Sequence, residues 1–313
     1  MSLPMPAARR IRISFNWAQH RIRIKMASQV FPSHNSLQTQ TSVLRASFAN
    51  GGAGTFVTDK YHTAPIKIAK AFPLEGQLGV IVMDVSPGLL NGDRYEFDWR
   101  ACASTYTFIT NQSYTKVHPS EEEGGSSMLQ SFVLDEDAVI EHMPEPIMLY
   151  QSARLDNETR VTLAPGAVWM QADVLCPGRT LRNEVFRYRE LRNSLTVYYG
   201  EELIFVQRQR VKPEEQMLSA SGCWEGQTHW ATFYLFSDRV NGTLLEVLQT
   251  VLDHLPPFQQ HTVLAGATLT YRHGIAVSAA STAAWPLQQT MRLLWQAARM
   301  SLLGKPPLSF LKS

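Results

Sequence analysis

The residues with the chemistry for a functional site lie in irregular polar segments that separate apolar stretches of the chain. The side chains suited to acid–base work in these segments are Asp93, Lys116, His118 and Glu184, and Cys176 opens the last of them. Carboxylate, ammonium and imidazole groups gathered at one site would support a hydrolase or an isomerase. Structural alternatives stand beside this: Asn91-Gly92-Asp93 is a favourable turn sequence, and a lone cysteine is usually a small buried apolar residue.

The familiar catalytic signatures are absent from the sequence. Gly51-Gly-Ala-Gly54 lacks the lysine of a phosphate loop, and no GxGxxG, HExxH or GxSxG pattern occurs. None of the nine histidines has another four residues away, so no helix offers a histidine pair to a metal. The three cysteines are too far apart for a zinc ribbon or a disulfide framework, which favours a reducing cytoplasm. The sequence therefore carries none of these catalytic motifs and no phosphate loop of its own, although an enzyme could still assemble its site from distant residues.

The charge distribution separates the first part of the chain from the rest. The net charge of the 313 residues is +2, but seven basic residues precede Asp59, the first acidic one, and leave the remainder at −5. A body with this balance argues against a nucleic-acid partner. No stretch approaches the 18 apolar residues of a membrane span. Residues 1–41 are basic and lack a strand rhythm, so we expect a disordered extension, with a transit peptide or a start of translation at Met26 as alternatives.

From about residue 42 onward, large apolar residues alternate with polar ones, which predicts half-buried strands. Strand-turn-strand units begin at residues 97, 132, 161 and 195, spaced 35, 29 and 34 residues apart. This recurrence indicates hairpins stacked in series, with an ordinary sandwich as the alternative. Two apolar stripes at helical spacing, residues 244–255 and 287–302, predict helices in the C-terminal third. We therefore expect one mostly β domain over residues 42–313, in β-helix-like or sandwich-like layers, with two α-helices.

The polar segments resemble, in order, the motifs of the UreD (UreH) family of urease accessory proteins. The matching segments are residues 64–76, 87–93 (PGLLNGD), 109–118 (ITNQSYTKVH), 140–147 (IEHMPEPI), 178–186 and 294–307 (LWQAARMSLLGKPP). Six motifs in sequence make the resemblance specific, and it covers residues 42–307. The sequence departs from the family pattern at Asn91, where a glycine is usual, and at His118, where a tyrosine is usual.

The resemblance implies a maturation scaffold with a mostly β fold, which is not an enzyme and holds no tightly bound cofactor. Proteins of this family bind UreF, reach the GTPase UreG through it, and dock on the urease apoprotein. Nickel brought by UreG or the metallochaperone UreE then reaches the dinuclear urease site, by a route proposed to pass inside UreD. GTP is used by UreG and not by this chain, and a dimer formed through UreF is also implied.

A nickel route needs transient ligands, because a closed high-affinity site would trap the ion. Asp93 and Glu184 are the predicted carboxylates of such a route, with His118 and Cys176 as additions. Buried carboxylates need partners or water, so we expect a water-filled passage beside them. The hydrolase or isomerase built from Asp93, Lys116, His118 and Glu184 is the main alternative. A carbohydrate-binding β-solenoid is a weaker one, because the aromatic residues alternate like core residues.

Overall fold

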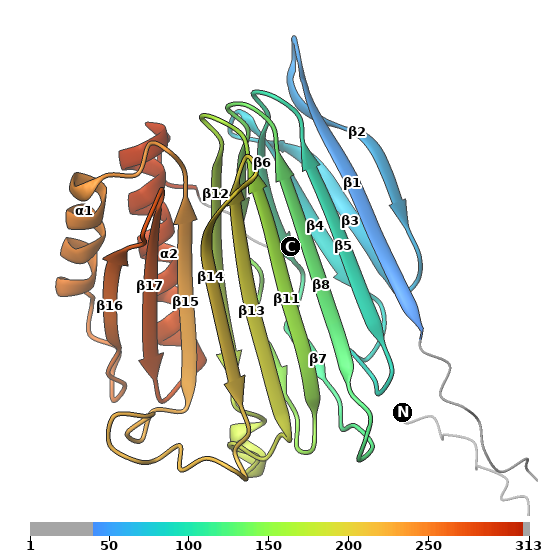
Figure 1. Cartoon of the computed structure of the whole chain (residues 1–313), viewed down its shortest axis with the longest axis vertical. Helices are drawn as coiled ribbons and strands as arrows, with labels where there is room; N and C mark the ends of the chain where they lie inside the picture. The colour runs from blue at the N-terminus through green and yellow to red at the C-terminus, as the bar shows by residue number, and fades with distance from the viewer. Residues whose placement is uncertain (1–39, 309–313) are drawn as a thin grey trace, which may run out of the picture. The chain divides into compact units, whose positions relative to one another are not determined.

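The computed structural model describes residues 40–308, which form two large β-sheets and two helices (Figure 1). Sheet 1 has seven strands in the order β14 (Glu202–Val211), β13 (Glu190–Tyr199), β11 (Arg154–Leu163), β8 (Ser126–Leu134), β5 (Arg94–Ala101), β1 (Thr41–Gly51) and β2 (Gly54–His62). The main path of sheet 2 runs through β16 (Leu264–Leu269), β17 (Gly274–Ser281), β15 (His229–Phe236), β12 (Val168–Cys176), β9 (Val139–His142), β6 (Tyr106–Asn111), β4 (Gln77–Asp84) and β3 (Ile66–Leu74). Short strands β7 (Thr115–Val117) and β10 (Ile147–Leu149) extend sheet 2 beside β12.

The predicted mostly β, layered fold is confirmed. Successive units place one strand in sheet 1 and the next in sheet 2, and strands of neighbouring layers pair in parallel: β5 with β8, β8 with β11, β6 with β9, and β9 with β12. The two strands of a unit therefore do not pair as the expected hairpin, because the turn between them carries the chain from one sheet to the other. An antiparallel hairpin does form from β13 and β14.

The connections at the two ends of the layers differ in length. At one end, the turns from sheet 1 to sheet 2 span only residues 102–105, 135–138 and 164–167. At the other end, the connections from sheet 2 back to sheet 1 are long, and they cover residues 85–93, 112–125, 143–153 and 177–189 apart from short elements within them. We call this the long-loop end; it lies at the bottom of Figure 1. Loops held by a rigid scaffold are the usual place for functional residues.

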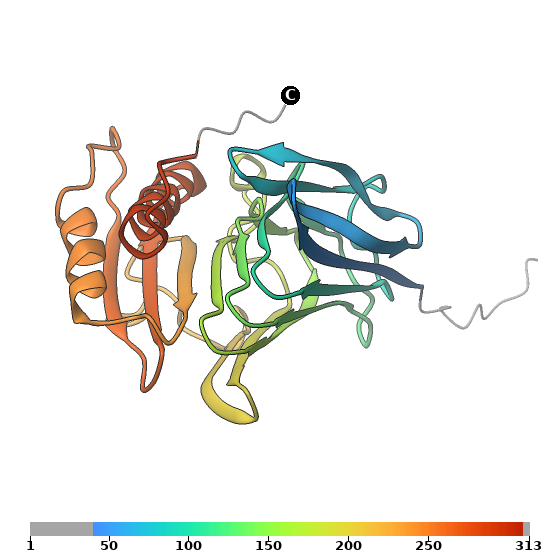
Figure 2. The same ribbon diagram turned by 90° about the horizontal axis from the view of Figure 1, so that it is seen from above.

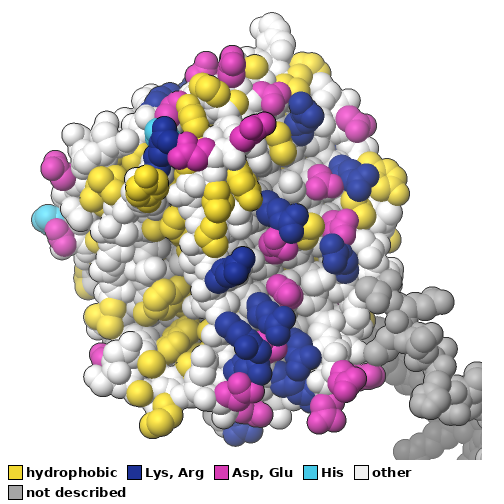
Figure 3. Space-filling view, in the orientation of Figure 1, with side chains coloured by type: hydrophobic (Ala, Val, Ile, Leu, Met, Phe, Trp, Pro, Cys, Tyr) yellow, Lys and Arg dark blue, Asp and Glu magenta, His cyan; other side chains and the backbone are white. Residues whose placement is uncertain are grey.

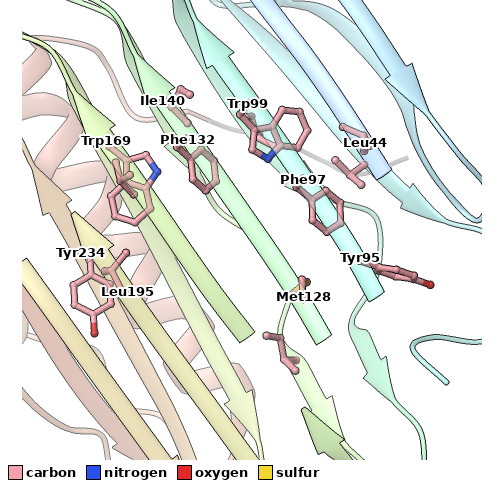
Figure 4. Close-up of a cluster of buried hydrophobic side chains, with 14 of the residues drawn as sticks. Leu44, Tyr95, Phe97, Trp99, Met128, Phe132, Ile140, Trp169, Leu195 and Tyr234 are labelled. Carbon is pink, nitrogen blue, oxygen red and sulfur yellow. The ribbon is translucent and has the colours of Figure 1, made fainter. Parts of the chain in front are cut away.

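The main core lies between the two sheets and is built from the alternating residues of both. Figure 4 shows Phe97, Trp99, Phe132 and Trp169 in this space. The rings of Phe132 and Trp169, from opposite sheets, have centroids 5.6 Å apart, and both side chains are fully buried. Burial of such rings removes a large apolar area from water and so holds the sheets face to face.

The second core lies on the other face of sheet 2, under helices α1 (Gly242–Asp253) and α2 (Ala284–Leu303). Figure 2 shows both helices on one side of the C-terminal strands. The two predicted helices are thus confirmed: Asn241 accepts a hydrogen bond from the Leu244 amide at the start of α1, and Gly304 ends α2 in the left-handed conformation. β12 is covered on both faces, which explains its almost continuous apolar sequence. None of the helices in the described part is long and apolar enough to cross a membrane.

The predicted N-terminal extension, residues 1–41, falls outside the described residues except for its last two, and Thr41 already begins β1.

Candidate functional site

All five residues that the sequence singled out lie at or beside the long-loop end. Asp93 ends the connection into β5, Lys116 and His118 lie in and after β7, Cys176 ends β12, and Glu184 lies in the next connection. The five candidate residues thus lie toward one end of the molecule, although their side chains do not form one cluster. Lys116 lines a cavity between the sheets, whereas Asp93 lines a separate hollow of about 400 Å³.

Asp93 closes a turn in the loop before β5. Its carboxylate accepts a hydrogen bond from the Leu90 amide at 2.8 Å, and its own amide donates to the Leu90 carbonyl at 3.0 Å. The loop packs on the next polar segment, because the Leu89 amide donates to the Lys116 carbonyl at 2.9 Å. Gly88 permits this approach: a Cβ there would lie 2.4 Å from the Lys116 carbonyl oxygen, and its φ is +128°. The carboxylate of Asp93 thus stabilises a turn, as the turn sequence Asn91-Gly92-Asp93 also suggested.

Glu184 is buried and held by Arg179. The Arg179 Nε donates to the carboxylate at 2.7 Å, Nη2 makes a second bond to it, and these hydrogen bonds lower the pKa of Glu184. Arg179 also lies over the ring of Tyr150 at 4.1 Å, and the ring of His118 lies 5.0 Å from that of Tyr150. These contacts join three of the long connections. A carboxylate so paired is a weak candidate for binding a passing ion unless Arg179 moves.

Cys176 is almost completely buried, and burial raises the pKa of its thiol to about 12. It is therefore a neutral thiol at physiological pH, which is a poor metal ligand. Lys116, in contrast, is exposed at the mouth of the inter-sheet cavity. Asp93 and Lys116 line different cavities, and the carboxylate of Glu184 is already bound by Arg179. The geometry therefore gives no support to a catalytic site built from Asp93, Lys116, His118 and Glu184.

The inter-sheet cavity has a volume of about 80 Å³, which is room for several water molecules. One wall comes from β5 and β8 of sheet 1, and the other comes from β4, β6, β9 and β12 of sheet 2. The loop residues around Gly88, Tyr114 and Pro144 line its mouth toward the long-loop end. Its polar lining includes Asp84, to which the Tyr95 hydroxyl donates at 3.1 Å.

The deepest polar groups of this cavity are His142 and Asp173, joined through Gln171. The Gln171 side chain accepts from His142 Nδ1 at 2.8 Å and donates to the Asp173 carboxylate at 2.7 Å. Burial lowers the pKa of His142 to about 4, so its imidazole is neutral and Nε2 is the acceptor nitrogen. Burial also raises the pKa of Asp173 to about 6, although the side chain keeps some exposure because it lines the cavity.

The polar lining continues into sheet 1 as a row of inward-facing amides and hydroxyls. Gln130 of β8 lines the cavity, and its neighbour in register on β11 is Thr159. In the adjacent row, the Asn157 amide donates to the side-chain carbonyl of Asn193 on β13 at 2.8 Å. All but Asn193 are at least nine-tenths buried. Polar residues at inward positions of an otherwise apolar core are costly, so a row of them points to a function.

A buried ion pair supports the cavity from the helix side of sheet 2. Neighbouring strand residues face opposite ways, so Glu141 of β9 points toward α2 while His142 points into the cavity. Arg299 of α2 bonds the Glu141 carboxylate at 2.6 and 2.8 Å, and neither side chain has any exposed area. Gln77 and Tyr106 also donate to this carboxylate. Two of the segments that carry the family resemblance, residues 140–147 and 294–307, therefore meet here.

Sequence reasoning missed His142, Gln171 and Asp173. A signal existed: in β12 the two polar residues stand two apart in the run Trp169-Met-Gln-Ala-Asp-Val-Leu175, so they share a face of a strand that is otherwise apolar. His142 likewise follows Glu141 in a short buried strand.

Residues 40–308 hold no group of three or more His, Cys, Asp or Glu side chains arranged to bind a metal ion. The donors of the cavity instead come singly or in pairs, an arrangement that suits brief contact rather than storage.

Comparison with known proteins gives a consistent result. Residues 40–311 match the family model described as UreD urease accessory protein. The urease accessory protein UreD of Acetivibrio thermocellus is 29% identical over 254 residues, covering 80% of this chain and 94% of that protein. UreD 2 of Streptomyces griseus is 27% identical and covers 85% of this chain and 92% of its own length. UreH of Helicobacter hepaticus is 24% identical over 208 residues, which cover 66% of this chain and 82% of that protein. The chain therefore belongs to the UreD family of urease accessory proteins, and this membership supports a role in urease maturation.

Proposed function

We propose that this chain is a maturation scaffold that docks on apo-urease and helps to deliver nickel to its dinuclear site. The observation that carries the proposal is the polar cavity between the sheets, with a neutral imidazole and a carboxylate at its deepest part. Family membership supplies the process in which such a cavity would serve.

Nickel is the cargo in this proposal, and it moves through the cavity as a partly hydrated ion. His142 Nε2 and the Asp173 carboxylate are the donors that would replace water in its shell. Imidazole and carboxylate are suitable ligands for Ni²⁺, and two of them with water bind less tightly than a closed site of four. The raised pKa of Asp173 makes the carboxyl easy to protonate, which would help release. Asp93, Glu184, His118 and Cys176 remain predictions as transient ligands of a nickel route.

The partners follow from the family resemblance. UreF binds the chain, UreG joins through UreF and hydrolyses GTP, and UreE supplies nickel indirectly. A dimer formed through UreF, a cytoplasmic location and the absence of a tightly bound cofactor belong to the same proposal. The lack of a phosphate loop in this sequence agrees with GTP being used by a partner.

The test is a deletion of this gene in its host, followed by measurement of nickel per urease active site and of urease activity. Urease from the deletion strain should be nearly empty, and the intact chain should restore it. Asp173→Asn combined with His142→Gln should lower nickel loading while leaving the maturation complex assembled. Asp137→Asn, an exposed carboxyl at the short-turn end, is the matched control.

Fully loaded urease in the deletion strain would refute the maturation role. Normal loading by the Asp173/His142 variant would refute the cavity route and leave the maturation role standing. Loss of the assembled complex in that variant would show that these residues act on folding or docking instead.

A further inference from the structure

The outer face of sheet 1 is rich in arginine. Among the six neighbouring strands β1, β5, β8, β11, β13 and β14, all but β8 carry arginines at positions that alternate with the core residues. There are eight of them: Arg45, Arg94, Arg100, Arg154, Arg160, Arg192, Arg208 and Arg210. We call this surface the arginine face. Figure 3 looks onto it and shows Lys and Arg side chains spread over the sheet, densest toward the long-loop end. None of these six strands, all within the described residues, contains a lysine.

The charges of the arginine face are mixed but unequal. Five carboxylates share the outward positions: Glu96, Asp98, Asp156, Glu158 and Glu190. Eight arginines against five carboxylates leave a formal excess of three positive charges. Several arginines form ion pairs within the sheet. Arg160, for example, pairs with Glu158 at 2.6 Å, yet the Arg160 side chain stays 59% exposed. Guanidinium groups held this way keep further donors for a second carboxylate.

Glu190 fixes the part of the face near the long-loop end. Arg192 and Arg210 donate to its carboxylate at 2.9 and 2.7 Å, and Arg154 Nε lies 3.7 Å from it. The Glu190 side chain is only 5% exposed. Burial by itself raises the pKa of this carboxyl, but the hydrogen bonds from Arg210 and Arg192 outweigh burial and hold the pKa below its usual range. One buried carboxylate thus orients two guanidinium groups by hydrogen bonds, with the charge of Arg154 close beside them. Side chains ordered in advance lose less entropy when a partner binds.

Exposed apolar side chains lie among the charges. Val133 on β8 and Leu203 and Val206 on β14 are between 36 and 50% exposed. Arginine is enriched and lysine depleted at protein–protein interfaces, and the aliphatic side chains add apolar contact area. The interleaved carboxylates would repel a phosphate backbone, and they argue against a nucleic acid as the occupant.

We propose that the arginine face docks an acidic surface of apo-urease. The inference rests on the proposed function, since a maturation scaffold must meet the enzyme that it serves, and charge complementarity selects the class of surface. Carboxylates of the partner bind the exposed guanidinium edges, and the aliphatic side chains add apolar contacts, two of them at the β14 edge of the sheet. Such an interface weakens with salt because much of its attraction is between charges near solvent.

The test measures binding of the chain, purified with UreF and UreG, to apo-urease from the deletion strain at about 50 mM and about 500 mM NaCl. Arg100→Gln, Arg160→Gln and Arg208→Gln combined remove three exposed charges from β5, β11 and β14 without touching the Glu190 group. Lys60→Gln, Lys67→Gln and Lys70→Gln on β2 and β3 remove the same charge elsewhere. We expect the arginine variant to bind about tenfold more weakly at low salt and to lose most of the salt dependence. The lysine variant should bind normally.

Equal binding by the arginine variant and the unaltered complex overturns the inference, as does an equal loss in the lysine variant or no binding by the unaltered complex. A duplex RNA probe bound through the same three arginines, with urease binding unchanged, would assign the face to nucleic acid. Nickel loading in the host is the separate readout: rescue by the unaltered chain upholds the proposed function whichever way the docking result falls.

Discussion

The buried pair of Glu141 and Arg299 gives the sharpest test of the packing of α2 on sheet 2. Replacing Arg299 by methionine preserves most of the side-chain volume but leaves the Glu141 carboxylate without its counter-charge. Both side chains are fully buried, so water cannot take the place of the guanidinium. Gln77 and Tyr106 still donate to the carboxylate, but the Pro306 carbonyl loses its hydrogen bond from Arg299 Nε. We expect a loss of about 4 kcal/mol in the free energy of unfolding.

The double variant Glu141→Leu with Arg299→Met separates the charge from the packing. It removes both ions, and it also removes an unsatisfied donor, since Arg299 Nη2 has no hydrogen-bond partner within the described residues. An apolar replacement of a whole buried pair is often neutral, so the double variant should lie within about 1–2 kcal/mol of the unaltered chain.

The assay is urea unfolding followed by tryptophan fluorescence and circular dichroism, with all variants at one pH. Arg292→Met, at an exposed arginine of the same helix, is the control and should change stability by less than about 0.5 kcal/mol. The reasoning is refuted if Arg299→Met costs less than about 1 kcal/mol, or if the double variant is no more stable than the single one. The second result would mean that the stranded carboxylate is not the source of the loss.

Two further predictions concern the cavity and the loop beside it. A carboxyl whose pKa is about 6 when folded and 3.8 when unfolded destabilises the folded state by about 3 kcal/mol above pH 7. Asp173→Asn should therefore stabilise the protein by about that amount at pH 8, and the gain should vanish as the pH falls through 6 toward 4; a gain that does not change with pH would contradict it. The lowered pKa of His142 makes the unaltered chain and the Asp173→Asn variant lose the same stability over this fall in pH. It therefore cancels in the difference between their free energies of unfolding. Gly88→Ala should lower stability by about 2 kcal/mol, because the new Cβ meets the Lys116 carbonyl and φ is positive, whereas Gly52→Ala, with nothing within 4 Å, should be neutral in the same thermal unfolding assay. Equal effects at the two glycines would show that the close approach is relieved by a small movement of the loop.

The layered fold was predictable because its signal is repeated. Alternation such as Tyr95, Phe97 and Trp99 marks the buried face of a strand directly, and the stripes of the two helices are long enough to be unambiguous. The crossing of each short turn from one sheet to the other was not predictable. An apolar strand, a four-residue turn and another strand look alike whether the strands pair with each other or with neighbouring layers, since only long-range contacts distinguish the two.

The candidate site was predictable in position but not in its innermost residues. Loops rich in glycine, proline and amides identify themselves by composition, and they pointed to the long-loop end, beside the inter-sheet cavity. The partners of Glu184 and Asp93 depend on loop geometry that no local pattern encodes. His142 and Asp173 escaped because a polar residue in a strand is normally read as solvent-facing, and burial of both faces of β12 appears only when the helices are in place.

The parallel layers have a consequence for how the molecule opens. In a linear array each layer gains its stability mainly from the layers on either side, so fraying starts at terminal strands and advances inward. The terminal strands here are β2, β14, β3 and β16, while His142 and Asp173 lie on β9 and β12, well inside the order of sheet 2. We therefore expect the layers that carry the cavity to exchange their amide hydrogens last. The proposed nickel route through this cavity would keep its width through local openings at the ends of the array, and the loops at its mouth would be the part most free to move.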